Sequence, residues 1–390
     1  MKNFNKNSII FIAVVLFVLV GLASGALVNQ VFFAVKGLCQ DVFAGNPEAF
    51  RNFTVRIDDT SDLLRYQDQL LDLNSAKENL LGTRIIFKDD TTLVKADSGS
   101  ILGWSSNAPV TEEEVEKTVQ KAQWIQTIAQ NNGADFLYCT VTKKGFYESV
   151  PENFRTYDRE NYEKILNALS AAGIPLMDSE ETFKSLDIPQ EDIFFKTDHH
   201  WTPLAGFYLH GAICAQLQER YGFAYNPEYT DLENYHVETY ENWSLGSYGK
   251  KVGTFFTNAG ADDFDVITPL FQTDFVEEIP YRQENRTGSF EDTMLYREYL
   301  VKGYYSRNNY TTYSGGDYRL QKITNTNQQE GEKILIIRRS FGCVVTPFLA
   351  IHAKELHVID DREGGYPAGD RIDLEAYIQE IQPDYVIILD

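Results

Sequence analysis

The apolar positions of the chain follow two alternating patterns. Short apolar runs at 83–87, 136–141, 174–177, 333–337, 356–359 and 385–389 are typical of strands, and the longer runs predict strands buried on both faces. Between them, apolar residues three or four positions apart predict helices from Thr111 to Gly133 and over about 157–172, 204–220 and 374–381. Thr111 and Glu114 form a capping-box pattern at the first of these. Strands alternating with helices imply an α/β fold with a parallel sheet covered on both faces.

The N-terminal segment departs from this alternation. Residues 9–28 are almost entirely apolar or small, Lys2 and Lys6 precede them, and no further charge occurs before Lys36. About 20 such residues suffice to cross a bilayer, and the lysines keep the leading end in the cytoplasm. We therefore expect residues 1–30 to anchor the chain in the cell membrane, with the rest extracytoplasmic. The alternative is a signal peptide cleaved at the small residues 23–26, which would secrete the chain.

The remaining sequence predicts two further segments. Residues 31–80 read as a stalk and lead-in helices, and residues 81–390 as one α/β domain. Within that domain, residues at about 223–330 are rich in Tyr, Asn, Asp, Gly and Thr and contain many turn signals. We interpret this stretch as an irregular, β-containing insertion.

Charge and composition limit the classes of partner and cofactor that we expect this protein to bind. The formal net charge of -22 argues against nucleic acid, because an acidic surface repels phosphates. The four cysteines form no CxxC pair. Asp198, His199 and His200 have no evident fourth metal ligand at a fixed spacing, because His210 is expected well inside the following buried helix. We therefore expect neither a metal nor another cofactor.

The segment 198–203, Asp-His-His-Trp-Thr-Pro, carries the most chemical information. Thr202 suits a helix N-cap and Pro203 the first helical position. Asp198 and His200 then lie just before a buried helix, where the chain is held firmly. An imidazole in this position can act as a general base, and a carboxylate two residues earlier can orient it.

Ser340 occupies a second strand–helix junction. It follows the strand that ends at Ile337 and precedes Phe341, Gly342 and an apolar helical segment. This arrangement can expose a serine nucleophile, with the backbone N–H groups of Phe341 and Gly342 facing an oxyanion. A serine in such a turn is more often a helix cap. Its occurrence together with the Asp-x-His junction nevertheless favours a Ser–His–Asp triad.

Four stretches resemble the bacterial DHHW family: FFKTDHHWTPLAGFY, SLGSYGKKVG, YSGGDYRLQKITN and ILIIRRSFG with VTPFLA. That family is similar to the alginate O-acetyltransferase group of SGNH-hydrolase-like proteins. The resemblance implies a flavodoxin-like, three-layer α/β/α fold. It also implies Asp198 as the triad acid, His200 as the base and Ser340 as the nucleophile, in the chain order of that group.

The resemblance is imperfect around the serine. Arg339 stands where related sequences carry an acidic residue, and Cys343 stands where they carry a side-chain amide. Arg339 could activate the serine or bind an anionic substrate, or it could disrupt the loop. Trp201 could stack on a sugar or pack in the core, and Tyr248 lies in a Gly-rich turn expected at the cleft rim.

These expectations support three functions. The first is an extracytoplasmic O-acetyltransferase acting on an exported polysaccharide or cell-envelope glycan. Because one span cannot carry acyl groups across a bilayer, this function implies a polytopic membrane partner that supplies them. The second is a carbohydrate esterase that uses the same triad with water as acceptor. The third is a catalytically inactive glycan-binding or envelope-scaffold protein.

Overall fold

The computed structural model describes residues 66–390, except 89–90, 104–107, 153, 363–365 and 367–370, together with positions 33, 36, 37, 40, 41 and 48. The chain divides into two compact units, Met1–Leu81 and Gly82–Asp390. The expected anchor at 1–30 and most of the expected stalk lie outside the described residues. In the first unit, α4 spans Gln67–Leu80. Among the described residues, no helix has both the length and the apolar character needed to cross a membrane.

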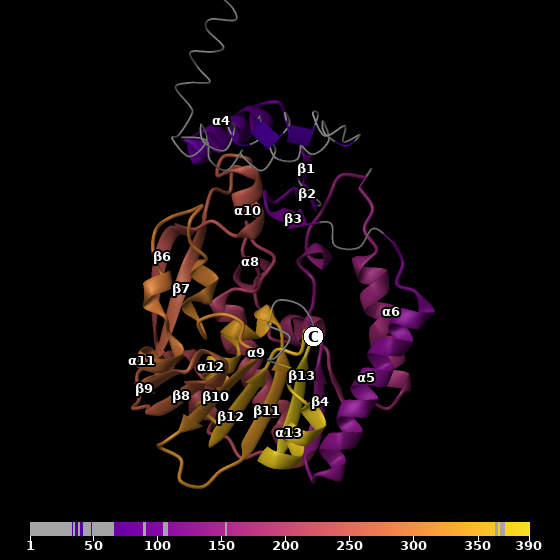
Figure 1. Cartoon of the computed structure of the whole chain (residues 1–390), viewed down its shortest axis with the longest axis vertical. Coiled ribbons are helices and arrows are strands. Elements are labelled where there is room, and N and C mark those ends of the chain that lie inside the picture. Colours follow the sequence, from indigo (N-terminus) through magenta and orange to yellow (C-terminus); the bar gives the residue numbers. More distant parts are fainter. Residues whose placement is uncertain are drawn as a thin grey trace, which may run out of the picture. The chain divides into compact units, whose positions relative to one another are not determined.

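The second unit is built on an eight-stranded sheet in the order β5-β4-β13-β11-β12-β10-β8-β9 (Figure 1). The five strands from β5 to β12 run parallel. The last three strands continue the sheet in antiparallel fashion. The strands are β4 Asp135–Cys139, β5 Leu176–Met177, β8 Phe275–Ile279, β9 Glu284–Gly288, β10 Leu320–Asn325, β11 Lys333–Arg338, β12 Glu355–Ile359 and β13 Tyr385–Leu389.

Helices cover both faces of this sheet, as the alternation of strands and helices predicts. One face packs against α5 (Glu112–Asn131), α6 (Asp158–Ala171) and α13 (Leu374–Ile381). The other packs against α7 (Ser179–Ser185), α9 (Pro203–Tyr221) and α12 (Thr346–Leu349). Alternate residues of β11 divide between the two cores, with Ile334 and Ile336 on one side and Leu335 and Ile337 on the other. This two-sided burial explains the continuous apolar runs and confirms the three-layer α/β class.

The segment at 223–330 is more regular than the sequence analysis predicts. Its strands β6 (Tyr235–Ser244) and β7 (Asp262–Pro269) form a separate antiparallel pair, while β8, β9 and β10 extend the main sheet. The central sheet is therefore mixed, not wholly parallel. Local periodicity does not reveal a strand's partner, which is why this extension escapes a reading of the sequence. The segment also contains two short helices, α10 (Ser247–Val252) and α11 (Phe290–Met294).

The first predicted strand, at 83–87, also lies outside the central sheet. β1 (Ile85–Lys88) pairs with β2 (Thr91–Lys95), which pairs with β3 (Ile101–Gly103), in a three-stranded antiparallel sheet outside the central one. A further short helix, α8 (Gln190–Ile193), precedes the Asp-His-His-Trp segment.

Three parallel strands end side by side. Arg338 at the end of β11 is in register with Leu389 of β13, and Leu389 is in register with Cys139 of β4. Ligand sites of open α/β sheets lie at the carboxyl ends of the strands. Ser340 follows Arg338 by two residues, so the serine lies at this edge.

Candidate active site

Ser340 begins the 3-10 helix η8 (Ser340–Val344), directly after β11. The sharp change from strand to helix puts the serine at the exit of the strand and leaves its side chain partly accessible. This is the exposed strand–turn–helix position that the sequence predicts.

The structure brings the three predicted triad residues into one hydrogen-bonded chain. Nε2 of His200 lies 2.8 Å from Oγ of Ser340, and Nδ1 of His200 lies 2.6 Å from Oδ1 of Asp198. An ionised carboxylate only accepts hydrogen bonds, so this contact places the imidazole proton on Nδ1. Nε2 is then free to accept the proton of the serine hydroxyl, which is the arrangement needed for nucleophilic catalysis.

The loop before α9 holds Asp198 and His200 in place. The Thr202 hydroxyl accepts a hydrogen bond from the N–H of Ala205 at 3.1 Å, and Pro203 is the first residue of the helix. The N-cap pattern therefore behaves as predicted. A helix that is buried along one side fixes the position of the residues that lead into it.

Asp198 is buried and accepts further hydrogen bonds. Its Oδ1 also accepts from the backbone N–H of His200 at 3.0 Å, and its Oδ2 accepts from the N–H of Ser247 at 2.5 Å. Burial raises the pKa of Asp198, but His200, His199 and the Ser247 N–H together outweigh it and bring the pKa well below its usual value. The carboxylate therefore stays ionised beside the imidazole.

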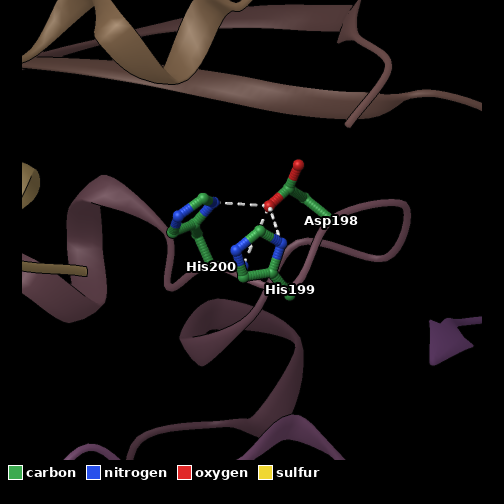
Figure 2. Close-up of side chains that lie close together, drawn as sticks. All are labelled: Asp198, His199 and His200. Atoms are coloured by element: carbon green, nitrogen blue, oxygen red, sulfur yellow. Dashed lines mark hydrogen bonds and ion pairs between the residues drawn. The ribbon is translucent and has the colours of Figure 1, made fainter. Parts of the chain in front are cut away.

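His199 shares the same carboxylate, as Figure 2 shows. Its Nδ1 lies 3.3 Å from Oδ1 of Asp198 and 3.1 Å from the Ser247 hydroxyl, and its ring centroid lies 3.7 Å from that of His200. Burial lowers the pKa of His199 to about 4, so the ring is neutral at pH 7.

Ligand atoms of Asp198, His199 and His200 lie within 4.8 Å of one another. Oδ1 of Asp198 already accepts a hydrogen bond from Nδ1 of His200, so these two atoms are engaged with each other.

Two residues that the sequence analysis missed clamp this loop. The buried Lys144 ammonium donates to the carbonyls of Ile101, Lys196 and Asp198 at 2.9, 2.7 and 3.1 Å. Burial lowers the pKa of Lys144 to about 8. The buried Asp262 carboxylate accepts from the N–H groups of Lys196 and Thr197 at 2.5 and 2.9 Å. Neither residue belongs to a local motif, so no sequence signal marks it.

Aromatic rings surround the imidazole. Tyr310, also missed by the sequence analysis, stacks on His200 with ring centroids 4.1 Å apart, and its hydroxyl donates to the Phe341 carbonyl at 3.3 Å. Trp201 is fully buried and packs edge-on against Phe183 and Phe341. Because the ring is enclosed, neither of its faces is available to stack on a sugar. The interpretation of Trp201 as a sugar-stacking residue is therefore wrong, and its side chain instead packs the Asp-His-His-Trp segment against the core.

The two expected oxyanion donors differ in availability. The Gly342 N–H donates to the Arg339 carbonyl at 2.9 Å, so it is already engaged, and the expectation for Gly342 is corrected. Ser340 and Phe341 are the first two residues of η8, and such N–H groups have no acceptor within their own helix. Gly342 matters for packing, because a Cβ there would lie 2.7 Å from the Arg338 side chain.

Arg339 and Cys343, the two residues that depart from the family pattern, pair with groups outside the proposed triad. The Arg339 side chain is half exposed, and its Nε lies 3.2 Å from Oδ1 of Asp390. Cys343 is buried, and its Sγ accepts from Arg338 at 3.1 Å. Arg338 is itself buried and paired with Asp317. The Gly-Gly-Asp turn at 315–317 thus supports the chain behind the serine.

Tyr248 lies in α10, close against Gly103, where a Cβ would overlap its ring. Burial raises its pKa. With His199 and Phe341 it lines a cavity of about 130 Å³. The sequence predicts a Gly-rich turn at this position, whereas the segment forms the helix α10.

A family model, the SGNH hydrolase-like domain of the acetyltransferase AlgX, matches residues 105–315. The chain belongs to this family. The matched segment includes Asp198 and His200, whereas Ser340 lies beyond it. The predicted resemblance to the SGNH-hydrolase-like alginate O-acetyltransferase group is confirmed. No curated protein matches the chain.

Solved structures share the fold of this family member. A DHHW family protein from Eubacterium siraeum has 21% sequence identity and a TM-score of 0.55, covering 78% of this chain and 91% of its own. PatB1 from Bacillus cereus has 20% identity and a TM-score of 0.60, covering 77% of this chain and 95% of its own. At these identities the likeness concerns the fold.

Proposed function

We propose that this protein is an extracytoplasmic O-acetyltransferase that modifies an exported polysaccharide or cell-envelope glycan through Ser340, His200 and Asp198. The observation that carries the proposal is the 2.8 Å separation between Nε2 of His200 and Oγ of Ser340, with Asp198 on the opposite nitrogen. Membership of the AlgX acetyltransferase family supports acyl transfer as the reaction class.

The reaction proceeds in two halves. Oγ of Ser340 attacks the acyl carbonyl of the donor while Nε2 of His200 takes the hydroxyl proton. His200 returns that proton to the leaving group, and an acyl-serine remains. A sugar hydroxyl then attacks the acyl-serine, gives its proton to His200, and releases Ser340, which recovers the proton. The ionised Asp198 stabilises the imidazolium in both halves.

The oxyanion of each tetrahedral intermediate needs hydrogen-bond donors. The N–H groups of Ser340 and Phe341 are the proposed donors, since both open η8 beside the reacting oxygen.

Location and partners belong to the same proposal. Residues 1–30 would act as a membrane anchor, or as a cleaved signal peptide, and place the catalytic domain outside the cytoplasm. Acyl groups for an extracytoplasmic site have to cross the bilayer, so a polytopic membrane protein would deliver them.

A carbohydrate esterase is the second candidate, because the same triad hydrolyses an acyl-serine when water replaces the sugar. An inactive scaffold is the third. The positions of Arg339 and Cys343 weaken it, because Arg339 pairs with Asp390 and Cys343 with Arg338, so neither replaces a triad hydrogen bond.

One set of measurements separates these functions. PatB1 has been solved with a sulfonyl adduct, so a sulfonyl fluoride is a suitable serine-directed probe. We expect it to label the wild type but not Ser340→Ala, as read by intact-protein mass spectrometry. Labelling of both variants alike, or of neither, would contradict the proposed nucleophile. If the protein hydrolyses p-nitrophenyl acetate but forms no acetylated sugar when a glycan is added, the result would favour the esterase.

A further inference from the structure

Two adjoining cavities are lined by the residues that flank Ser340 in the sequence. The larger, about 640 Å³, is lined by the first turns of α5 and α6 and by residues at the ends of β4, β11 and β13, including Thr118, Asn161, Tyr162, Arg339 and Asp390. The smaller, about 130 Å³, is lined by His199, Tyr248 and Phe341. Arg339 precedes Ser340 and lines the larger cavity, Phe341 follows it and lines the smaller one, and Ser340 itself lines neither. Lys143 and Asp158 line both cavities, which shows that they adjoin.

The two cavities differ in size. The smaller one, about 130 Å³, has roughly one fifth of the volume of the larger one, about 640 Å³. Pockets for small-molecule ligands commonly measure about 300–1,000 Å³. The larger cavity is therefore of a size that suits sugar units, and the smaller one suits a short acyl group.

The linings agree with this division. The smaller cavity contains the apolar side chains of Leu102, Val150, Phe154 and Phe341, which suit the methyl end of a short acyl chain. The larger groove mixes hydroxyl, amide, aromatic and charged side chains, which suit the hydroxyl groups and ring faces of a sugar. Both signs of charge are present in its lining, which includes Lys143 and Arg339 as well as the carboxylates of Glu114, Asp158 and Asp390.

We propose that the groove between the first turns of α5 and α6 binds an oligosaccharide acceptor, while the smaller cavity receives the acyl group carried by Ser340. This assignment rests on the proposed transferase function and specifies its acceptor site. Because the groove is lined by none of Ser340, His200 and Asp198, acceptor binding can be blocked without touching the proposed triad.

Helix α5 offers a matched pair of substitutions. The hydroxyls of Thr118 and Thr127 each donate to the carbonyl four residues earlier, at 3.0 and 2.7 Å, but Thr118 lines the groove and Thr127 is exposed elsewhere on the helix. Thr118→Trp fills part of the groove, whereas Thr127→Trp adds the same ring outside it. Any general effect of a tryptophan on α5 is therefore common to both variants.

The experiment uses p-nitrophenyl acetate as donor and cellohexaose, chitohexaose and hexamannuronate as acceptor probes. Acetylated sugar is measured by mass spectrometry and total acetate release by absorbance. We expect Thr118→Trp to lower the ratio of transfer to hydrolysis by about tenfold or more, while Thr127→Trp keeps the wild-type ratio.

Two outcomes would overturn the assignment. Equal ratios in the two tryptophan variants would place the acceptor elsewhere. A parallel loss of transfer and hydrolysis in Thr118→Trp would mean that the groove is not specific to the acceptor. Two other results bear on the proposed function instead. Wild-type protein that hydrolyses the ester but acetylates none of the three glycans would favour the esterase, and failure of the proposed triad would abolish Ser340-dependent labelling in the wild type.

Discussion

Lys144 donates a hydrogen bond from its buried ammonium group to the backbone carbonyl of Asp198, 3.1 Å away. The same ammonium holds the carbonyls of Ile101 and Lys196. One cation thus fixes the loop that carries the proposed acid and base, Asp198 and His200, to a strand of the small antiparallel sheet. The position of His200 relative to Ser340 therefore depends on a residue that touches neither of their side chains.

Replacing Lys144 with methionine tests this dependence. The buried carbonyls of Ile101 and Asp198 lose the ammonium donor, whereas the Lys196 carbonyl still accepts from the N–H of Ile101. We therefore expect the free energy of unfolding to fall by about 3 kcal/mol. We also expect kcat for p-nitrophenyl acetate to fall by roughly tenfold to a hundredfold, because His200 is no longer held in line with Ser340. Urea denaturation and ester hydrolysis measure the two effects.

The control for this variant is Lys117→Met. Lys117 is exposed and forms an ion pair with Glu113, a kind of interaction that contributes at most about 0.5 kcal/mol. If Lys144→Met matched Lys117→Met in stability and in kcat, the proposed clamp would have no role.

Gly246 provides a second test of how Asp198 is positioned. A Cβ at this residue would overlap the Cβ of Asp198 and lie 2.7 Å from its Cα, so Gly246→Ala has to displace the triad acid or its own turn. We expect kcat to fall by about tenfold or more. Steady-state kinetics and the melting temperature distinguish a local displacement from unfolding.

Gly211→Ala serves as the comparison, since a Cβ there meets the side chain of Thr230 at 3.2 Å, away from the triad. Wild-type kinetics in Gly246→Ala would indicate that the turn relaxes without moving Asp198.

The buried His352 predicts loss of stability in mild acid. Within the described part of the chain, neither of its ring nitrogens has a hydrogen-bond partner, and burial lowers its pKa from 6.5 to about 4. Between these values the unfolded chain binds a proton that the folded chain does not. The free energy of unfolding therefore falls as the pH drops, by about 2 kcal/mol between pH 7.5 and 5 for this group.

The substitution His352→Phe removes that contribution while keeping a ring in place. We expect the variant to lose less stability than the wild type between pH 7.5 and 5, as measured by urea midpoints. His236→Phe is the matched control, because His236 is exposed. An unchanged pH dependence in His352→Phe would show that this histidine is not the acid-sensitive group.

Glu277 predicts the opposite pH dependence. It is fully buried in β8, accepts hydrogen bonds from Tyr296 and Gln321, and burial raises its pKa from 4.5 to about 7. Between these values the folded chain keeps a proton that the unfolded chain loses, so stability decreases as the pH rises. Glu277→Gln mimics the protonated form, and we expect it to gain up to about 3 kcal/mol at pH 8 and little at pH 4.5.

The neighbouring Glu278 is exposed on the same strand, so Glu278→Gln should leave both stabilities unchanged. Equal urea midpoints for Glu277→Gln and the wild type at pH 8 would mean that Glu277 ionises without cost.

Much of the fold could be predicted because its signals are local. Strands buried on both faces appear as apolar runs, and the helix starting after Thr111 carries the capping box that the structure contains. The antiparallel extension by β8, β9 and β10 could not be predicted, because the hydrogen-bonding partner of a strand depends on residues far along the chain.

For the site, the sequence by itself determined the three residue types of the proposed triad, their order, the N-cap that follows His200 and the strand–helix junction at Ser340. The segment with Asp198 and His200 follows the short helix α8 and not a strand. Only the tertiary structure decided that they meet, because Ser340 and His200 are 140 positions apart and depend on the sheet to align them. It also decided which groups support them. Lys144, Asp262 and Tyr310 act through burial and long-range contacts, and no spacing along the chain encodes where a buried charge finds its partners.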